Sequence, residues 1–470
     1  MFHSKLSEKT VKDTLLYAKK DKSILFLGIC GMGMSTLARL LKKEGYRVIG
    51  YDTAPSGEHR RLLFDGIPVF THECGIDLTD VALIVYTLAM RDDHPLLCSD
   101  IPQCSRAQLL GALMDDYPIR IAIAGTHGKS TVTSLVHRAL CALGEHPTTL
   151  SGADLGDGEG PLSIGEKKIL LYECCEYKNS FLYTKPSHAL LLNLELDHTD
   201  FFPTVESLEE SFLGFASLAE HTVYLASDKG LSRIAQRLPQ TAHPYYLVDL
   251  NTEGAPSFPY AKITFQQKEH YTYTFHTEGE APVSLAPTVG GLVGVYNTLG
   301  ALSLLTELSY DPHRVAEILS TLPPIARRME LLGWLGTRPL YYDFAHHPTE
   351  ISSTVSTLTQ RHGTPPTLIF APHTYTRTRD LWDGFVSALS TSPEVYLAPI
   401  TSAREAPIEG VTSERLATEI GACAHPLSHL VNNLDILLKG SAPIVLMGAG
   451  DLREIKDKIQ KMQTFLPIKE

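Results

Sequence analysis

The 470-residue sequence has no run of eighteen apolar residues, so we expect no segment that spans a membrane. Its first twenty residues also lack the apolar stretch of a secretory signal peptide, which favours a cytoplasmic location. Basic residues are not in excess, because 41 Lys and Arg stand against 53 Asp and Glu, for a formal net charge of −12. Nucleic-acid-binding proteins usually carry a basic patch or stripe, so this charge argues against a nucleic-acid partner.

The eight cysteines lack the spacing of a common zinc-binding motif. No two of them form a Cys-x-x-Cys pair, and most lie in apolar stretches. Reduced, buried thiols of a cytoplasmic protein are therefore the expected state. The cysteine pattern gives little support to a zinc site.

The chain is too long for a single hydrophobic core, and its pattern divides into three α/β blocks. Residues 1–117 alternate strand-like and helix-like runs, as in a doubly wound, Rossmann-like domain. Residues 118–326 resemble a P-loop ATPase-like α/β domain and include a stretch near 260–279 with the alternation of antiparallel strands. Residues 327–470 again alternate strands with helical spacing. We predict three α/β domains in series, with Rossmann-like domains at both ends.

A phosphate-binding loop is predicted at Gly125–Ser130. An apolar strand precedes it and a helical pattern follows it, so backbone N–H groups and the helix N-terminus converge on an anion. Lys129 adds a mobile cation, and Ser130 can present its hydroxyl to Mg²⁺. The spacing Gly-x-x-Gly-Lys-Ser is shorter than the usual motif, because position 123 is Ile rather than Gly. We interpret this loop as the ATP site.

A second glycine-rich turn, with Gly28, Gly31 and Gly33, follows the strand-like run Ser23–Leu27. It resembles a dinucleotide fingerprint, but its glycines are in the wrong order for Gly-x-Gly-x-x-Gly. The helix N-terminus at this turn still predicts binding of a diphosphate, but the turn does not predict hydride transfer. A purely structural turn is the alternative.

Acidic groups and a histidine follow two apolar strands of the central block. Glu173 ends the run Ile169–Tyr172, and Asp197, His198 and Asp200 follow the run Ala189–Leu194. Oxygen ligands at a strand end beside a phosphate loop suit Mg²⁺. An ordinary surface or core histidine is the alternative for His198.

Polar groups also follow two strands of the third block. Asp343, His346 and His347 follow one strand, and Arg377 and Arg379 follow the next. Two arginines at this spacing can clamp a carboxylate or a phosphate. A solvated basic turn is the alternative.

Ten motifs, taken together and in order, are similar to those of the Mur ligase family, which acts in bacterial peptidoglycan precursor synthesis. The resemblance covers about residues 24–450 and is strongest to the branch that adds L-alanine to UDP-N-acetylmuramate. It implies that the first domain binds the UDP-sugar, the central domain binds ATP, and the third binds the amino acid. The motifs are GICGMGMS, VYTLAMRDDHP, GTHGKST, NLELDHTDFF, YNTLGAL, RRMELLG, YDFAHHPTE, PHTYTRTRD, SAREAP and LMGAGD.

The resemblance implies roles for particular residues, with ATP as co-substrate and Mg²⁺ as cofactor. The implied catalytic residues are Lys129, Glu173, His198 and His346. The implied metal ligands are Ser130, Glu173 and His198. The implied ATP-binding residues are Gly125, Thr126, His127, Gly128, Lys129, Ser130, Thr131, Asn297, Arg328 and Asp343. The implied UDP-sugar-binding residues are Gly31, Met32, Gly33, Met34, Ser35, Asp52 and Thr87. The residues implied to position the amino acid or a carboxylate are His346, His347, Arg377 and Arg379.

Three positions depart from the family pattern. The usual Glu-Ala-Asp-Glu is Glu173-Cys174-Cys175-Glu176 here, so Cys175 replaces an aspartate. Tyr296 replaces a histidine before Asn297, and Thr374 stands where many members have arginine. These changes alter the charge expected around the metal and the substrates.

The sequence leaves four alternative functions to compare with this one. A ligase that recycles a whole tripeptide onto the same UDP-sugar is the nearest, but the segment after Glu176 is compact here. A D-glutamate-adding relative lacks this close match to the first glycine-rich turn. An NAD(P)-dependent oxidoreductase leaves Gly125–Ser130 unexplained, and a nucleotide-binding module without ligase activity stays open. We expect a monomer or a weak homodimer.

Overall fold

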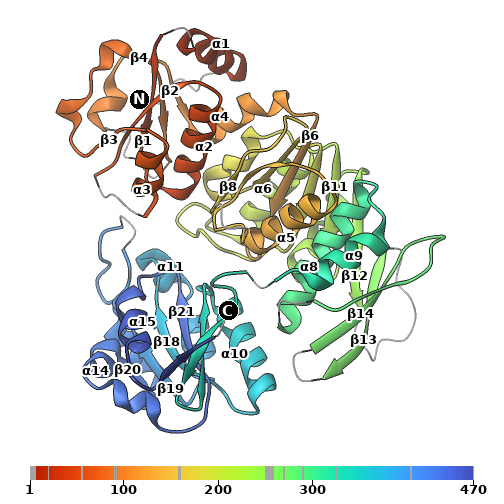
Figure 1. Ribbon diagram of the computed structural model, residues 1–470, viewed down its shortest axis with the longest axis vertical. Coiled ribbons are helices and arrows are strands. Elements are labelled where there is room, and N and C mark those ends of the chain that lie inside the picture. The colour runs from red at the N-terminus through yellow and green to blue at the C-terminus, as the bar shows by residue number, and fades with distance from the viewer. Residues whose placement is uncertain are drawn as a thin grey trace. The chain divides into compact units, whose positions relative to one another are not determined.

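The computed structural model describes residues 7–19, 21–53, 57–88, 90, 93–156, 160–248, 259–267, 270–287, 290–323, 325–402 and 405–468. The chain forms two compact units, one with residues 1–194 and 206–244 and the other with residues 195–205 and 245–470. The predicted α/β class is confirmed, because the strands form three sheets connected largely through helices (Figure 1). The predicted domain boundaries at 117 and 326 stay a prediction. No helix among the described residues combines the length and the apolar character needed to cross a membrane.

The first sheet lies in the first unit and is parallel throughout, with strand order β3-β2-β1-β4-β5. Its central strand, β1, is buried along its whole length, which matches its uninterrupted apolar sequence. The elements are α1 (Glu8–Ala18), β1 (Ser23–Leu27), α2 (Met32–Lys43), β2 (Arg47–Tyr51), α3 (Gly57–Phe64), β3 (Val69–Phe70), β4 (Val81–Tyr86), β5 (Gln103–Ser105) and α4 (Arg106–Leu113).

Of the ten-stranded second sheet, this unit contains six strands in the order β11-β10-β6-β9-β7-β8. All neighbours are parallel except β7 and β8. The carboxyl ends of the central strands β6, β9 and β10 therefore lie at one edge, where the phosphate loop begins. The elements are β6 (Ile119–Ala124), α5 (Lys129–Ala142), β7 (Thr148–Leu150), β8 (Leu162–Ser163), β9 (Ile169–Glu173), β10 (His188–Leu191), α6 (Val205–Ala216), β11 (His221–Leu225) and α7 (Lys229–Ile234).

The second unit contains the predicted antiparallel portion, where β13 pairs antiparallel with β14 and β14 with β15. β12 pairs parallel with β13. Alternate residues of β14 (Tyr271, Tyr273 and Phe275) and of β15 (Val283 and Leu285) are buried, as a period-2 pattern requires, whereas Phe265 of β13 is exposed after an irregularity in the pairing. The elements are β12 (Ala242–Val248), β13 (Tyr260–Gln267), β14 (His270–His276), β15 (Val283–Leu285), α8 (Gly291–Glu307) and α9 (Pro312–Thr321).

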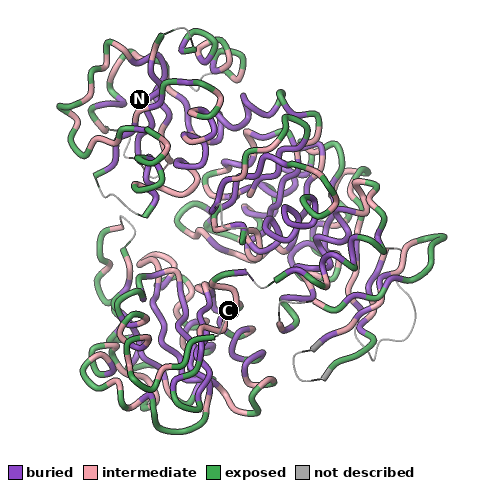
Figure 2. Tube along the Cα trace, viewed as in Figure 1, coloured by how far each residue is buried: buried purple, intermediate pink, exposed green. Residues whose placement is uncertain are grey.

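The remaining sheet of the second unit has the order β20-β19-β18-β21-β17-β16-β22 and buries both of its faces. Leu368 and Phe370 of β18 pack on one face with α10, α12 and α13, whereas Ile369 packs on the other with α14 and α15. Purple, buried segments accordingly run through its central strands (Figure 2). The elements are β16 (Glu330–Leu335), β17 (Arg338–Asp343), α10 (Pro348–His362), β18 (Thr367–Ala371), α11 (Tyr375–Asp380), α12 (Trp382–Leu389), β19 (Glu394–Leu397), α13 (Ser413–Ile420), β20 (Ala424–Pro426), α14 (Leu427–Val431), β21 (Ile444–Gly448), α15 (Arg453–Gln460) and β22 (Phe465–Pro467).

Candidate active site

The predicted phosphate loop connects β6 to α5. Gly128 is the N-cap of α5 and has φ 83°, a left-handed conformation that glycine adopts without strain. Gly125 has φ 144°, and a Cβ there would come within 3.0 Å of Leu192 Cβ. Among the described residues no side chain caps α5, so the start of the helix keeps its affinity for an anion.

Lys129, the first residue of α5, folds back over this loop. Its Nζ donates to the carbonyl oxygens of Gly125 and Thr126 and lies 3.2 Å from Glu176 Oε2. Burial on its own lowers the Lys129 pKa, but the charges of Glu176, Cys175 and Glu173 outweigh it and raise the net pKa. The ammonium is therefore charged at neutral pH and is held where a phosphate would enter.

Glu173 lies at the end of β9, next to the phosphate loop. Its Oε2 accepts from Ser130 Oγ at 3.1 Å, and its Oε1 accepts from Ser151 Oγ at 2.7 Å and Gly152 N at 2.6 Å. These donors fix the carboxylate toward Ser130. A hydroxyl and a carboxylate so close together offer the hard oxygen ligands that Mg²⁺ prefers.

Two further residues of this site were missed in the sequence. Asn193 follows β10, and its Oδ1 accepts from His127 N at 2.8 Å while its Nδ2 donates to His127 O at 3.1 Å. Glu176 is 1 % exposed and holds Lys129. The available signal was positional, because both residues follow strands that pair with β6.

The first glycine-rich turn lies between β1 and α2. Residues predicted to bind the UDP-sugar form hydrogen bonds in and around it. Asp52 is buried and accepts from Cys30 N at 2.9 Å, and buried Ser35 donates to Glu58 Oε2 at 2.8 Å. These contacts hold the turn, and Gly31 is the N-cap of α2. The next residues of the helix, Met32, Gly33 and Met34, form its first turn.

A cation and a hydroxyl-bearing residue lie beside this turn. A Cβ built on Gly33 would meet Arg106 Cδ at 3.3 Å, and one built on Gly28 would meet Thr87 Cγ2 at 2.7 Å. Arg106 was not among the predicted residues, and it begins α4, far along the sequence. Its guanidinium gives the turn a positive charge suited to a diphosphate.

In the second unit, residues 195–199 contact the ends of α10 and α11. Glu195 Oε1 accepts from Thr349 Oγ1 at 2.6 Å, and Thr199 Oγ1 donates to Asp380. Between them, Asp197 receives both Nε and Nη2 of Arg377 at 3.1 Å. Both partners of this bidentate pair are nearly buried.

Both arginines of the predicted clamp are thus already bound to protein groups. Besides its Asp197 contacts, Arg377 donates Nη1 to His373 O at 2.9 Å. Arg379 is half exposed and pairs with Asp380 through Nε and Nη2. A substrate carboxylate would use the remaining N–H groups of Arg377 or displace Asp380 from Arg379.

His346 and His347 have different surroundings at the start of α10. His346 Nδ1 lies 3.0 Å from Phe344 O, and an Nδ1–H donor there leaves Nε2 as a proton acceptor. His347 is 3 % exposed and caps α10, with Nδ1 accepting from Thr349 N at 3.4 Å. The geometry therefore suits a base at His346 and a helix cap at His347.

The predicted ATP contacts of the second unit are largely buried. Asp343 accepts from Thr354 Oγ1 at 2.8 Å and from Ala345 N at 3.2 Å. The Arg328 guanidinium lies 5.3 Å from the centre of the Phe344 ring, and Asn297 lies buried in α8. His198 has φ 53°, and its backbone oxygen accepts from Phe201 N and Phe202 N at 2.9 Å.

Burial and charge shift four pKa values in this cluster. Burial raises the pKa of Asp343 to about 6. Burial, assisted by the Arg377 and His346 charges, lowers the pKa of His373 to about 4, and burial also lowers that of His346. Burial on its own raises the Asp197 pKa, but Arg377 and His198 outweigh it and the net pKa is lowered strongly. Histidine in this setting is neutral near pH 7, as a proton acceptor must be.

The structure brings the predicted residues together as two groups. Lys129, Ser130 and Glu173 meet in the first unit, and His346 lies near Arg377 in the second, which also contains His198. Parts of two quoted motifs, residues 89, 91 and 92 and residues 403 and 404, lie outside the described residues.

Three family models match successive parts of the chain. They are described as the Mur ligase family catalytic domain, the Mur ligase middle domain, and the Mur ligase glutamate ligase domain. The matched residues are 23–118, 123–305 and 327–450.

Individual relatives match over nearly the whole length. The UDP-N-acetylmuramate–L-alanine ligases of Acetivibrio thermocellus and Agathobacter rectalis are each 32 % identical, over 97 % and 94 % of this chain and 99 % and 98 % of their own. Among solved structures, the UDP-N-acetylmuramate-alanine ligase of Thermotoga maritima aligns with a TM-score of 0.74 at 21 % identity. A murein peptide ligase of Psychrobacter arcticus aligns with a TM-score of 0.70, also at 21 % identity. Each alignment covers 93 % of this chain and 98 % of the other, and at this identity both show the fold alone.

Proposed function

The chain belongs to the Mur ligase family, and from that premise we propose that it joins L-alanine to the lactyl carboxylate of UDP-N-acetylmuramate at the expense of ATP. The observation that carries the proposal is the loop at Gly125–Ser130, with Lys129 and Glu173 beside it, in a chain 32 % identical to UDP-N-acetylmuramate–L-alanine ligases. The reaction would serve bacterial peptidoglycan precursor synthesis in the cytoplasm.

The chemistry is carboxylate activation by phosphoryl transfer. A lactyl carboxylate oxygen attacks the γ-phosphorus of ATP, the bond to the bridging oxygen breaks, and ADP leaves with that electron pair. The amine of L-alanine then attacks the acyl phosphate carbonyl, loses a proton, and expels inorganic phosphate. Catalysis of this kind needs positioning and neutralisation of charge rather than a protein nucleophile. Lys129, once released from Glu176, would bind the transferring phosphoryl group.

The residues at the end of β9 fit a magnesium ion. Ser130 Oγ and Glu173 Oε2 lie 3.1 Å apart, and the carboxylate is oriented by Ser151 and Gly152. Such supporting hydrogen bonds are typical of metal-ligating carboxylates. Bound Mg²⁺ would neutralise charge on the nucleotide phosphates. We assign Ser130, Glu173 and His198 as its ligands.

The three predicted domains, 1–117, 118–326 and 327–470, would then hold the UDP-sugar, ATP and L-alanine. His346 is the base we assign to the alanine ammonium, because its Nε2 is the acceptor nitrogen and burial keeps the ring neutral. A monomer or weak homodimer is the assembly we expect.

ADP release tests the proposal directly. UDP-N-acetylmuramate is supplied with ATP, Mg²⁺ and, in separate reactions, L-alanine, glycine, L-serine or the tripeptide, and the Lys129→Ala protein serves as the blank. We expect release that depends on both UDP-N-acetylmuramate and L-alanine. Release with the tripeptide alone would assign the recycling reaction instead. Release without any acceptor would indicate a nucleotide-binding module that is not a ligase.

A further inference from the structure

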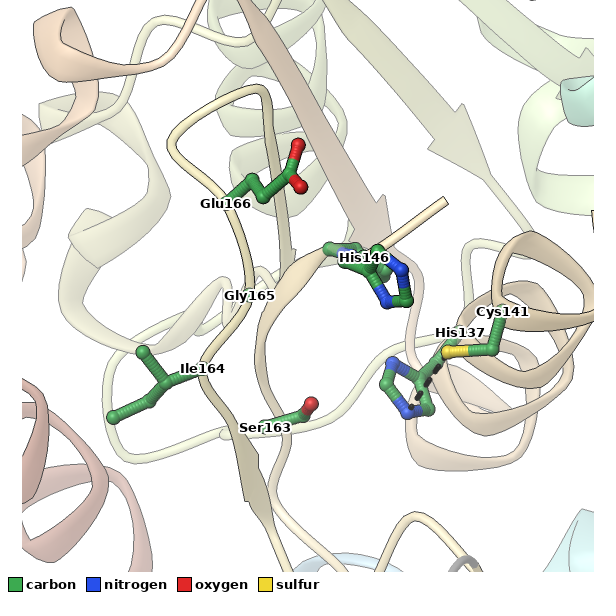
Figure 3. Close-up of a pocket in the computed structure, with 8 residues that line it drawn as sticks. His137, Cys141, His146, Ser163, Ile164, Gly165 and Glu166 are labelled. Carbon is green, nitrogen blue, oxygen red and sulfur yellow. Dashed lines mark hydrogen bonds between the residues drawn. The ribbon is translucent and has the colours of Figure 1, made fainter. Parts of the chain in front are cut away.

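The proposed reaction requires a binding group for the lactyl carboxylate of the sugar nucleotide, which must meet ATP at Gly125–Ser130. A carboxylate that leaves water needs a cation or several hydrogen-bond donors in exchange. The cavity beside the second half of α5 supplies no permanent cation, because its eight lining residues include neither lysine nor arginine (Figure 3). The segment that follows β9 does contain one, at Lys178.

The backbone at Lys178 has an uncommon conformation that the surrounding residues hold in place. Lys178 and Asn179 are both left-handed, with φ/ψ of 51°/33° and 57°/27°. This conformation is unfavourable for a residue with a Cβ atom, and such residues cluster at functional sites. Asn179 N donates to Glu176 O at 2.9 Å, and Ser211 Oγ of α6 donates to Asn179 Oδ1. These two hydrogen bonds fix the turn that contains Lys178.

The same turn is joined to the phosphate loop. Its first residue, Glu176, is 1 % exposed, and Glu176 Oε2 lies 3.2 Å from Lys129 Nζ. Two residues of chain span at most about 7 Å. The Lys178 backbone therefore lies close to the group that holds the lysine of the ATP site.

The Lys178 side chain extends to the residues predicted to bind the sugar nucleotide. Its Nζ donates to Leu88 O at 2.8 Å. Leu88 directly follows Thr87, whose Cγ2 would be 2.7 Å from a Cβ built on Gly28 of the first glycine-rich turn. The Lys178 ammonium thus lies near one turn while its backbone lies near the other.

The Lys178 charge is available to a ligand. Its side chain is exposed, and among the described residues no carboxylate forms an ion pair with it. An ammonium group has three donors, so the hydrogen bond to Leu88 O does not exhaust them. By contrast, Lys168 in the same unit is paired with Glu145 at 2.6 Å.

We propose that Lys178 binds the lactyl carboxylate of UDP-N-acetylmuramate, an inference that rests on the proposed function. The diphosphate of the substrate would lie at the first glycine-rich turn, and its carboxylate would contact Lys178 Nζ beside the ATP site. This contact orients the carboxylate and offsets its repulsion from the triphosphate. Lys178 would thereby select sugar nucleotides that carry a carboxylate.

Two sugar nucleotides that differ in the lactyl group test the proposal with the full-length protein. UDP-N-acetylglucosamine lacks this carboxylate, and isothermal titration compares its affinity with that of UDP-N-acetylmuramate. We expect the wild type to bind UDP-N-acetylmuramate more tightly. Lys178→Met should weaken UDP-N-acetylmuramate binding by about 10–100-fold and leave UDP-N-acetylglucosamine binding unchanged, which also shows that the variant is folded. Lys178→Arg, which keeps the charge, should keep most of the preference.

Lys168→Met is the matched control. Lys168 is also an exposed lysine of the first unit, but it precedes β9, whereas Lys178 follows this strand. Its substitution should change neither affinity. A Lys178→Met protein that loses affinity for both nucleotides equally, or for neither, would overturn the proposal. A wild type without preference between the two nucleotides would overturn it as well.

ADP release distinguishes this outcome from failure of the proposed function. If the wild type releases ADP with UDP-N-acetylmuramate and L-alanine while Lys178→Met binds UDP-N-acetylmuramate normally, only the role of Lys178 is wrong. If the wild type binds neither sugar nucleotide, both proposals are wrong.

Discussion

At the scale of single residues, His373 shows how burial beside a cation shapes the acid sensitivity of the second unit. The groups that act on its ring are Arg377, His346 and Glu405, and burial with the two positive charges brings its pKa to about 4. The unfolded chain would bind this proton near pH 6.5, the ordinary value for histidine. The folded protein therefore resists protonation of His373 between these two values.

The sign of the pH effect follows from proton binding. Between about pH 4 and 6.5 the unfolded state holds more protons at this site, so the free energy of unfolding falls as the pH falls. From pH 7 to pH 5 the loss at His373 is roughly 2 kcal/mol. His373→Gln should lose that much less stability over the same interval, measured by urea unfolding at both pH values. Asp343 has the opposite dependence, but it is present in both proteins and cancels in the comparison. Equal losses in the two proteins would contradict the assignment.

The residues of the site could be predicted where a local motif carries them. Lys129 and Ser130 follow from the strand, glycines and helix around them, and the structure joins Ser130 to Glu173. Glu176 and Asn193 were missed because their roles depend on pairing between β6, β9 and β10, which no local pattern encodes. Whether these residues bind substrate stays a prediction.

At the scale of elements, residues 195–199 form a loop, with His198 in a left-handed conformation, and three of its side chains contact two helices. Glu195, Asp197 and Thr199 bind Thr349, Arg377 and Asp380, respectively. His198, the proposed metal ligand, lies between these contacts in the sequence. The hydrogen bonds of its neighbours to α10 and α11 therefore fix the position of its backbone.

Asp197→Asn tests this role. The change leaves the buried Arg377 guanidinium without its carboxylate, at a cost of about 3–5 kcal/mol in the free energy of unfolding. We also expect kcat/KM for L-alanine to fall by roughly a hundredfold, because His198 and Arg377 lose their fixed positions. Urea unfolding and steady-state kinetics measure the two effects. Asp200→Asn is the matched control, since Asp200 is exposed, and it should change neither by much. Similar behaviour of the two variants would show that the pair does not hold the segment.

The sequence predicted most accurately those apolar strands that are followed by helices. The strand expected at Ser23–Leu27 has those bounds in the structure, and the expected runs Ile169–Tyr172 and Ala189–Leu194 overlap β9 and β10. Strands β16 and β22, which pair antiparallel at one edge of the last sheet, were not predicted. β22 has three residues, and such short strands depend on a neighbour that is distant in sequence rather than on their own pattern.

At the scale of the whole molecule, the two glycine-rich turns lie on different sheets of the first unit. One follows β1 and has Arg106 beside it, whereas the other follows β6 and contains Lys129. Each turn has its own cation and its own helix N-terminus, which are the elements of an anion site. A chain with two such turns can hold a substrate diphosphate at one and transfer a phosphoryl group at the other.

If the two turns bind different ligands, a variant in each turn should lose a different function. Lys129→Ala should lower ADP formation by roughly 10²–10³-fold or more, because the charge on the transferring phosphoryl is no longer neutralised. Its affinity for UDP-N-acetylmuramate should persist. Arg106→Ala should weaken UDP-N-acetylmuramate binding while ATP binding stays near the wild-type value. Isothermal titration with each ligand separately, together with ADP release, distinguishes the two.

Arg106 begins α4 and Lys129 begins α5, and both positions are partly solvent-exposed, so neither truncation leaves a large cavity. Each protein serves as the folding control for the other, since the ligand it still binds reports an intact unit. If Lys129→Ala abolished binding of both ligands, the two turns would form one site. If Arg106→Ala left UDP-N-acetylmuramate binding unchanged, the first turn would hold the sugar nucleotide without that cation. The two turns are assigned to different ligands only if Arg106→Ala loses UDP-N-acetylmuramate binding alone and Lys129→Ala loses ADP formation alone.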